Sequence, residues 1–587
     1  MGSTSSLWYH YKSWHNTNNG IDAVQLTEES ETEQISTSSD MSSSTSIPTV
    51  VSQPPQKRLK RSHVSTAIKF RPVDKSRAEL ITQSICQMIT MDMLPFSTVE
   101  NKGFRKLMSV IEPDYKVPCR NTIIVRIEKM YDDKMMELKR NLENIKGVAL
   151  TTDGWTSLAV DSYITFTCHY FNENWELCTQ VLGFEEMRES HTADNIQDSL
   201  INIIETWNLT GKVIGISHDN AANVTNAVRN LQERDIYSSP CAAHTLQLSI
   251  NKGFENRMCS HLLKLASDIV AAFRHSPKRT NALENKISEL GQKKLCLIQR
   301  CPTRWNSSMD MLMRLLELRP AIVSIMLDRT LFNTKTAKKL KMLEEDWEYC
   351  QILVKLLKPL QLATTVLCYE RQVTISMIRP IVKSLIEKHL KLEDTDSTLA
   401  MVFKETVCNE LRRRFNIDFE EENGIAADIY SEYREVNIAQ IASLLDPRYK
   451  NLQFESSDRI REIIKQKIRS KIQSIRYISE NENTSNTKQS TVLDDLLGIV
   501  PLNSEDEFSR YLAEPQINHN DDPCLWWKSR ELTFPFLSVL AKNILCIPAS
   551  SASSERVFST AGSILSPKRN RMTPFHLSAL VFLNKNI

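Results

Sequence analysis

The sequence predicts a mixed α/β domain that is preceded by a small helical domain and followed by a much longer, mostly helical region. Three observations predict this fold class. Between residues 146 and 245, short β-branched and aromatic runs alternate with amphipathic helical segments. Beyond residue 246, apolar residues recur at helical spacing. With 587 residues, of which 41% are hydrophobic and 25% charged, the chain has enough apolar content for several folded domains.

Composition limits the classes to which the chain can belong. The 73 Lys+Arg and 71 Asp+Glu residues nearly cancel, so affinity for DNA must come from local basic patches. The 13 cysteines are odd in number and form no C-x-x-C pair, which is typical of an intracellular protein with reduced thiols. The sequence shows neither a secretory leader nor a run of 18 apolar residues, so we expect no membrane partner.

Residues 1–65 are expected to be a disordered tail. Nine of the twelve residues from Ser36 to Ile47 are Ser or Thr, which leaves little apolar surface to offset chain entropy. A basic cluster near the end of this tail is typical of a nuclear-import signal, which implies an import receptor as partner and the nucleus as location. A solvated charge run is the alternative. The cluster consists of Lys57, Arg58, Lys60 and Arg61.

Residues 66–145 are the expected small helical domain, because apolar residues recur at helical spacing from Leu80 to Ile89 and from Ile123 to Tyr131. Helices are also expected throughout residues 246–530 and in residues 531–587. In these two stretches they are expected at 261–273, 309–318, 340–357, 377–390, 406–415, 459–477 and 532–547, from Ser553 onward, and at 574–583.

Residues 146–245 are expected to form a mixed sheet with helices on its faces, in the order β-β-β-α-β-α-β. The turn Asn172-Glu173-Asn174 between two β-branched runs indicates a hairpin. Strands are expected at 147–152, 163–171, 175–184, 212–217 and 236–241, and helices at 194–207 and 220–231.

Two acidic residues stand at the ends of predicted strands. Asp153 directly follows the first strand, and Asp219 closely follows the fourth. The carboxyl ends of parallel strands meet at one sheet edge, where converging carboxylates can hold Mg²⁺ or Mn²⁺ for phosphoryl transfer. The structural alternative is that Asp153 makes a turn with Gly154 and that Asp219 caps a helix at Asn220.

Six short motifs stand along the chain in a particular order. They are TTDGWTS at 151–157, HDNAAN at 218–223, CAAH at 241–244, TRWNS at 303–307, LDPRYK at 445–450 and SASSERVFS at 551–559. In this order the chain resembles the hAT-superfamily transposases, and in particular their BED-finger subgroup, which includes many host-domesticated proteins. The resemblance extends from about residue 66 to residue 587. It implies an RNase H-like core that is interrupted by a large helical insertion at 246–530 and completed by residues 531–587.

The resemblance also implies a third carboxylate. By motif match, Asp153, Asp219 and Glu555 are the catalytic and metal-binding residues of a DDE-type transposase, with Mg²⁺ or Mn²⁺ as cofactor. In the family, two such ions activate water and then a DNA 3′-hydroxyl for strand cleavage and transfer. A dipole-favoured residue in the first turn of a helix is the alternative for Glu555. The alternative function is a catalytically inactive transcription or chromatin regulator that keeps the same fold as a scaffold.

Cys241 and His244 invite interpretation as zinc ligands. Two ligands are too few for a structural site, and no further C-x-x-C or H-x-x-x-H lies at a usable spacing. We expect a buried Cys beside the sheet, a His that donates a hydrogen bond, and no structural zinc. Since the family keeps this pair near its active site, both residues are predicted to be site-adjacent.

Arg300, Arg304 and Trp305 are the predicted DNA-binding residues. An exposed Trp beside cations can stack on an unpaired base while the cations hold phosphates. In the family, the matching Trp is associated with the unstacked DNA end. The alternative is a Trp in the core of the helical insertion.

A basic helix is predicted at 459–476, where seven Lys and Arg residues surround an apolar stripe. Such a helix can lie along a DNA backbone, and a solvated basic face is an equal alternative.

The apolar run at 534–547 favours either core packing or, since the family uses its C-terminal region for dimerisation, a homodimer or a higher homo-oligomer.

The BED finger of the subgroup requires a C-x-x-C motif and a paired-His tail. The first cysteine of this chain is Cys86, so the ligands of the finger are not found, although residues 5–11 (SSLWYHY) resemble its opening. Without these ligands a remnant finger is expected to be disordered, because zinc supplies the folding energy of such modules. Sequence-specific DNA recognition by a finger is therefore not expected from this chain.

Overall fold

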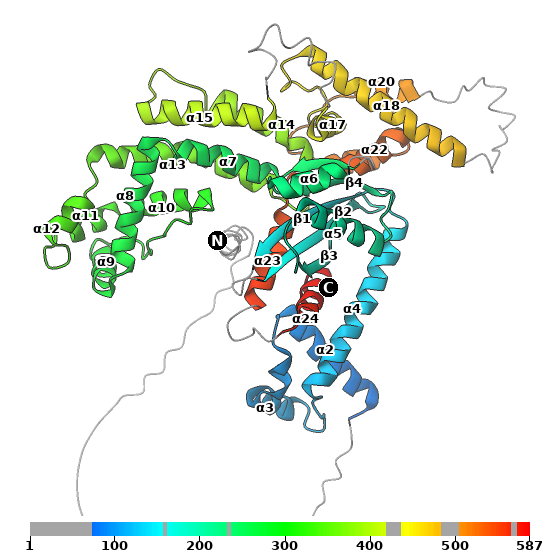
Figure 1. Ribbon diagram of the computed structural model, residues 1–587, viewed down its shortest axis with the longest axis horizontal. Coiled ribbons are helices and arrows are strands. Elements are labelled where there is room, and N and C mark those ends of the chain that lie inside the picture. Colours follow the sequence, from blue (N-terminus) through cyan, green and yellow to red (C-terminus); the bar gives the residue numbers. More distant parts are fainter. Residues whose placement is uncertain (1–72, 157–160, 232–235, 418–435, 483–503, 565–571) are drawn as a thin grey trace, which may run out of the picture.

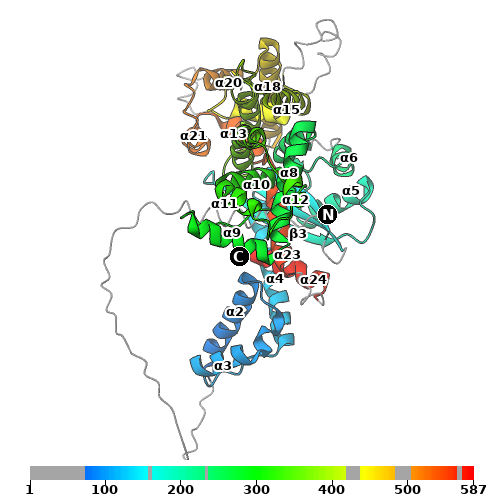
Figure 2. The same cartoon turned by 90° about the vertical axis from the view of Figure 1, so that its left-hand side faces the viewer.

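The computed structural model describes residues 73–156, 161–231, 236–417, 436–482, 504–564 and 572–587. The N-terminal tail lies outside these residues, as does its basic cluster of Lys57, Arg58, Lys60 and Arg61. Figure 1 shows a central sheet with helices of the N-terminal domain on one side of it and a long array of helices on the other. Figures 1 and 2 place α3 at one end of the molecule and α18 and α20 at the opposite end.

The centre of the fold is a five-stranded mixed sheet with the strand order β3-β2-β1-β4-β5. β1 pairs antiparallel with β2 and parallel with β4, while β3 and β5 form the edges. The expected element order β-β-β-α-β-α-β is confirmed, and with it the mixed α/β fold class. The elements are β1 (Val148–Thr156), β2 (Ser162–Phe171), β3 (Leu177–Glu186), α5 (Ala193–Thr206), β4 (Val213–His218), α6 (Ala222–Asn230) and β5 (Tyr237–Pro240).

The first strand is longer than the sequence predicts. It was expected to end before Asp153, but β1 continues to Thr156 because residues 153–156 pair with the antiparallel strand β2. Its parallel pairing with β4 ends earlier, at Thr151 opposite Ser217. Asp153 therefore lies inside β1 but beyond the end of the parallel ladder, which keeps it at the edge where β4 also ends.

The N-terminal helical domain is tied to the sheet by the last helix. α24 (Pro574–Asn586) packs against β3 and α4, and Phe582 lies edge-on to Tyr131 at a ring-centroid distance of 4.9 Å. The Asn586 side chain accepts the N–H of Val181 at 3.0 Å and donates to its carbonyl at 2.8 Å. These bonds occupy backbone groups of the edge strand β3. The domain consists of α2 (Lys75–Met91), η1 (Phe96–Glu100), α3 (Lys102–Ile111) and α4 (Arg120–Glu143).

The region after the sheet is helical, as expected. Its helices are α7 (Ala242–Phe254), α8 (Arg257–Arg274), α9 (Pro277–Glu289), α10 (Trp305–Glu317), α11 (Arg319–Leu327), α12 (Thr334–Lys339), α13 (Glu344–Leu367), η3 (Ile375–Met377), α14 (Ile378–Ser384), η4 (Leu385–His389), α15 (Thr398–Phe415), α17 (Ile438–Leu445), α18 (Asp458–Glu482), α20 (Ser504–Ala513) and α21 (Pro523–Arg530). The single helix expected at 377–390 is divided into α14 and a π-helical turn, η4. The change to η4 comes after Ser384. Pro380 lies earlier, in the first turn of α14, and has no N–H for the carbonyl of Ser376, which instead accepts the Ser443 hydroxyl at 2.8 Å.

Among the described residues, α13 is the one helix that is long and apolar enough to cross a membrane by length and composition. Neighbouring helices of the same region pack against one face of it. Trp347, Leu353 and Leu360 are at most 3% exposed and belong to the core that α13 shares with α8 and α10. One face of α13 therefore belongs to the core, while Leu362 of the same helix is 52% exposed.

The LDPRYK motif lies inside the helical region as a junction. Asp446 and Arg448 form a buried ion pair at 2.7 Å, and Asp446 accepts the hydroxyl of Ser376 at 2.6 Å. Lys450 donates to the carbonyl of Tyr511 in α20 at 2.6 Å. The motif thus joins η3, the end of α17 and α20, which gives it a structural role.

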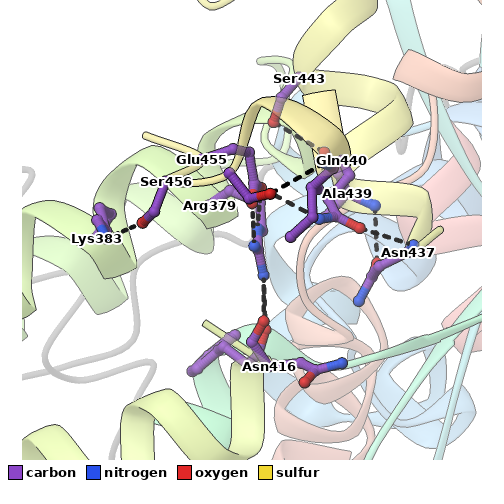
Figure 3. Close-up of polar contacts among 12 residues, drawn as sticks. Arg379, Lys383, Asn416, Asn437, Ala439, Gln440, Ser443, Glu455 and Ser456 are labelled. Atoms are coloured by element: carbon purple, nitrogen blue, oxygen red, sulfur yellow. Dashed lines mark hydrogen bonds and ion pairs between the residues drawn. The ribbon is translucent and has the colours of Figure 1, made fainter. Parts of the chain in front are cut away.

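A second buried ion pair lies close by, between Arg379 of α14 and Glu455 (Figure 3). Both side chains are at most 4% exposed, and their two hydrogen bonds measure 2.7 and 2.6 Å. Arg379 also donates to the carbonyls of Phe415 and Asn416, and Gln440 donates to Glu455 at 3.3 Å. The pair therefore ties together α14, the end of α15, α17 and the segment before α18.

The C-terminal helices complete the core of the sheet. α22 (Pro535–Leu545) packs against β2 and β4, and α23 (Ala552–Ile564) packs across β1 and β2. Phe558 of α23 stacks on Trp155 of β1 with ring centroids 5.8 Å apart. Leu537, Leu540 and Ile544 are at most 4% exposed, so the core-packing interpretation is confirmed for the apolar run of α22.

Candidate active site

Glu555 stands in the first turn of α23, which crosses β1 and β2. Figure 1 shows this helix beside the sheet, although it follows the whole helical region in the sequence. The hydroxyl of Ser554 lies 2.7 Å from that of Thr151 in β1. This contact brings Glu555 to the part of β1 that carries Asp153.

Asp153, Asp219 and Glu555 form one electrostatic cluster. Burial raises the pKa of the Asp153 carboxyl well above its usual value, and the nearby Glu555 and Asp219 carboxylates raise it further. Burial also raises the pKa of Glu555. Arg304 and Arg556 oppose this shift, whereas Asp219 adds to it. The structure therefore brings the three predicted acids together from β1, from the turn after β4 and from α23.

The side chains of Asp153 and Asp219 also accept hydrogen bonds from nearby backbone N–H groups. Asp153 Oδ1 accepts the backbone N–H of Gly154 at 2.9 Å, and Asp219 Oδ1 accepts that of Ala221 at 3.2 Å. The turn alternative is wrong for Asp153, because Asp153 and Gly154 both lie within β1 and pair with β2. The N-cap of α6 is Ala221, so Asp219 precedes this helix and does not cap it at Asn220. A local hydrogen bond to the backbone and membership of the acid cluster coexist in each residue.

The carboxylate oxygens of the cluster are the type of ligand that binds a hard divalent cation. Carboxylate oxygens are the ligands that Mg²⁺ and Mn²⁺ prefer, and a cation would relieve the repulsion that raises the pKa of Asp153. Within the described residues, however, no three His, Cys, Asp or Glu side chains are arranged to hold a metal ion. The three acids are electrostatic neighbours but do not form a closed ligand set.

Cys241 and His244 flank the cluster, as predicted. Cys241 is the N-cap of α7, is 1% exposed and accepts the backbone N–H of His244 at 3.4 Å. Burial and the nearby Glu555 raise the pKa of the Cys241 thiol to about 11. Burial lowers the pKa of His244, an effect that Asp219 opposes. The expectation of a buried Cys beside the sheet is confirmed.

Trp305 is not exposed. It begins α10 and is 2% exposed, within the core of the helical region. The interpretation as an exposed base-stacking Trp is therefore wrong, and the core alternative is confirmed. The reason is visible in the sequence: Met309 and Leu312 follow Trp305 at intervals of four and seven residues, which places all three on one buried helix face.

The two arginines near Trp305 differ in their surroundings. Burial lowers the pKa of Arg304, and the Glu555 carboxylate opposes this effect, which places Arg304 beside the acid cluster. Burial also lowers the pKa of Arg300, without a contribution from the cluster. Of the three predicted DNA-binding residues, the structure brings Arg304 to the acids.

The basic face of α18 is engaged with the protein itself. Ile464, Ile468 and Ile472 are buried, as the apolar stripe predicted. Among the cations, Arg469 pairs with Glu462 at 2.9 Å, and Lys471 lies 4.8 Å above the ring of Tyr237 in β5. These contacts favour the structural alternative for part of this face.

Sequence reasoning missed a group of buried polar residues next to the acids. Thr151 of β1, Thr167 and His169 of β2, and Ser553 and Ser554 of α23 hydrogen-bond to one another. We call these five residues the hydroxyl network. A signal for it was available, because Thr165, Thr167 and His169 alternate with apolar residues along a strand that is buried on both faces.

Comparison with known proteins identifies three regions of the chain. Residues 151–243 match the model of the ZBED1 RNase-like domain, and residues 239–356 match that of the ZBED1 RNase-like helical domain. Residues 507–587 match the hAT family C-terminal dimerisation region. These regions correspond to the sheet, the first part of the helical region and the segment that carries α23.

Three relatives cover most of the chain. The human "Zinc finger BED domain-containing protein 4" is 27% identical over 539 residues, which are 87% of this chain and 44% of that protein. "Putative AC transposase" of Zea mays is 25% identical over 84% of this chain and 63% of its own length. "Putative transcriptional regulator tpeD" of Talaromyces stipitatus is 24% identical over 85% of this chain and 61% of its own length.

The chain thus spans between 44% and 63% of the length of these relatives. The matched regions and the names of the relatives agree with the six motifs and with the strand order of the sheet. Residues 151–356 and 507–587 therefore resemble the RNase-like, helical and dimerisation regions of hAT-type, transposase-related proteins, in agreement with the motifs that lie within them.

Proposed function

We propose that this chain is a nuclear, DNA-binding protein of transposase type that cleaves or transfers DNA strands with divalent cations. The observation that carries the proposal is the cluster of Asp153, Asp219 and Glu555, in which Glu555 and Asp219 raise the pKa of Asp153 and Asp219 raises that of Glu555. Perturbed carboxyl groups that converge from distant parts of a chain mark functional sites. The similarity to a maize protein named as a transposase supports the same reaction class.

The chemistry assigns separate tasks to the residues of the site. Asp153, Asp219 and Glu555 would hold Mg²⁺ or Mn²⁺, which when bound supplies positive charge for the attacking and leaving oxygens of a phosphodiester. Arg304 lies beside Glu555, where its guanidinium suits a DNA phosphate. Cleavage joins a water oxygen to the scissile phosphorus, and the bridging oxygen leaves as a hydroxyl. Since no protein nucleophile takes part, the rate depends on positioning by these side chains.

A nicking assay on supercoiled DNA with Mn²⁺ tests the proposal. We expect the wild type to nick the DNA and Asp153→Asn to lose at least two orders of magnitude in rate, roughly the effect of removing one electrostatic element of an active site. Asp133→Asn is the matched control, because Asp133 is an exposed carboxylate on α4, outside the cluster. Equal nicking by the wild type and Asp153→Asn, or no nicking by either, would contradict the enzymatic proposal.

A catalytically inactive transcription or chromatin regulator is the second candidate. It is favoured by the observation that no three ligand-type side chains among the described residues are arranged to hold a metal ion. A relative that is named as a transcriptional regulator points the same way. In this case the fold is a scaffold, and we expect the wild type and Asp153→Asn to bind DNA equally well while neither cleaves it.

A second copy of the chain is a proposed partner. The region that matches the hAT dimerisation model includes Leu525, Leu532 and Phe575, which are 65%, 97% and 52% exposed. Exposed apolar side chains of this kind are available for an interface. Light scattering is expected to give at least twice the chain mass of 67.4 kDa. A monomer mass over the whole micromolar range would contradict dimerisation.

An import receptor is a further proposed partner, through Lys57, Arg58, Lys60 and Arg61. Replacing these four residues by Ala in a fluorescent fusion is expected to move the protein from the nucleus to the cytoplasm. An unchanged nuclear signal would contradict this assignment of the cluster.

A further inference from the structure

The hydroxyl network joins α23 to the sheet next to the acid cluster. Thr151 Oγ1 lies 2.7 Å from Ser554 Oγ and 3.0 Å from Ser553 Oγ, and it also hydrogen-bonds to the hydroxyl of Thr167. Ser553 Oγ lies 3.2 Å from Thr167 Oγ1 and 3.3 Å from His169 Nε2. All five side chains are at most 6% exposed. The network is therefore a buried polar contact between a strand pair and a helix.

His169 extends the network across the sheet. Its Nε2 lies 2.9 Å from Thr167 Oγ1, and its Nδ1 lies 3.1 Å from Thr179 Oγ1 in β3. Burial lowers the pKa of His169 to about 3, so its ring is neutral near pH 7. A neutral imidazole donates at one nitrogen and accepts at the other. The network thus connects β1, β2, β3 and α23 without carrying charge.

Hydrogen bonds are directional, so they restrict the position of a helix more than apolar packing does. A hydroxyl that is buried away from water costs free energy unless it is hydrogen-bonded. The hydroxyls of Thr151 and Ser554 can hydrogen-bond to each other only when α23 has one position along β1 and one rotation about its own axis. Apolar contacts are non-directional and tolerate small shifts along the strand. The network therefore fixes the position of α23 on the sheet, in addition to holding the helix against it.

The two ends of this contact stand directly beside two of the acids. Thr151 precedes Asp153 by two residues in β1, so both side chains point to the same face of the sheet. Ser554 is the residue before Glu555 in α23. A displacement of α23 at Ser554 would therefore move the Glu555 carboxylate relative to that of Asp153.

We propose that the hydroxyl network is the positioning device of the cation site, because it sets the separation between the carboxylates of Asp153 and Glu555. The inference rests on the proposed function, since it requires these two acids to share cations. Thr151, Ser553 and Ser554 are positioning residues in this scheme: they act through the strand and the helix on which the acids stand.

The test measures Mn²⁺ binding by the full chain, from the electron paramagnetic resonance signal of the free ion, together with the thermal unfolding midpoint. Thr151→Val and Ser554→Ala each remove one hydroxyl of the network. Each is expected to weaken Mn²⁺ binding by about 10- to 100-fold, the range seen when residues that orient metal ligands are changed. Thr151→Ser keeps the hydroxyl and is expected to bind like the wild type.

Two further variants separate positioning from general stability. Ser443 and Thr90 are 0% exposed, and their hydroxyls bond to backbone carbonyls outside the hydroxyl network. Ser443→Ala and Thr90→Val are expected to keep the Mn²⁺ affinity of the wild type. If they weaken binding as much as Thr151→Val does, general loss of stability explains the effect and the inference is overturned.

The outcome also distinguishes this inference from the proposed function. If Thr151→Val and Ser554→Ala bind Mn²⁺ like the wild type while Asp153→Asn does not, the positioning role is wrong and the proposed function stands. If Asp153→Asn binds Mn²⁺ as tightly as the wild type does, the cation site itself is absent and both are wrong.

Discussion

The hydroxyl of Thr151 lies 2.7 Å from that of Ser554, although 403 residues separate them along the chain. One of these residues stands two positions before Asp153 and the other one position before Glu555. The acid cluster therefore exists only when the first strand of the sheet and the helix that follows the entire helical region are folded against each other.

Asp153→Asn is expected to stabilise the chain when no divalent cation is present. The folded-state pKa of Asp153 lies above its unfolded value, so its ionisation costs stability as the pH rises from below the unfolded pKa to neutrality. Asn removes the charge and its repulsion. At pH 7 in a chelator, we expect the melting temperature to rise by a few degrees, since 1 kcal/mol corresponds to about 2–4 °C in a domain of about 150–250 residues. A lower melting temperature would contradict the electrostatic cluster.

His169 is expected to make the chain less stable in acid. Its pKa is about 3 in the folded chain, against the ordinary 6.5, so the unfolded chain binds the extra proton between these values. Stability from this residue is complete above pH 6.5 and is lost as the pH falls. Between pH 6.5 and 5 the loss is about 1.5–2 kcal/mol. Urea unfolding at both pH values should show a smaller loss in His169→Gln, and identical losses would speak against a buried neutral ring.

Trp305→Ala is expected to destabilise the chain by about 3–5 kcal/mol, the usual cost of truncating a buried aromatic side chain. Chemical denaturation monitored by circular dichroism measures this change. Tyr477 is 68% exposed, so Tyr477→Ala serves as the control and should stay within about 0.5 kcal/mol of the wild type. A Trp305→Ala variant as stable as this control would restore the exposed-Trp interpretation.

The contributions of Arg379 and Glu455 to the free energy of unfolding are expected to be coupled. Arg379→Met leaves the Glu455 carboxylate buried without its partner and should cost about 3–5 kcal/mol. The double variant Arg379→Met, Glu455→Leu removes both charges and should be more stable than the single variant. A double-mutant cycle by urea unfolding measures the coupling, and strictly additive effects would contradict it.

Much of the sheet could be predicted from local patterns. β2, β3 and β4 are β-branched or aromatic runs, and each lies within two residues of its expected start and end. The end of β1 was missed because its last residues pair with β2 and not with β4, a tertiary choice that the run around Asp153 does not encode. Likewise, the helix expected at 377–390 changes to a π-helical turn after Ser384, a change that its apolar spacing does not encode.

The site was predictable only in part. Strand ends supplied Asp153 and Asp219, but no periodicity relates either of them to Glu555, and only the resemblance of the motifs named it. Trp305 shows the opposite error: its place beside basic residues suggested exposure, whereas its spacing to Met309 and Leu312 already indicated a buried face. Local chemistry could identify which side chains suit a site but not which of them the fold brings to it.

The late position of α23 also has a consequence for biosynthesis. β5 ends at Pro240 and α23 begins at Ala552, so about 310 further residues are translated before the sheet receives its covering helix. At about 5–20 residues per second, the ribosome needs roughly 15 to 60 seconds for them. During this interval the apolar surface around Trp155 has no Phe558 to stack against, and the nascent chain is expected to need a chaperone until translation reaches α23.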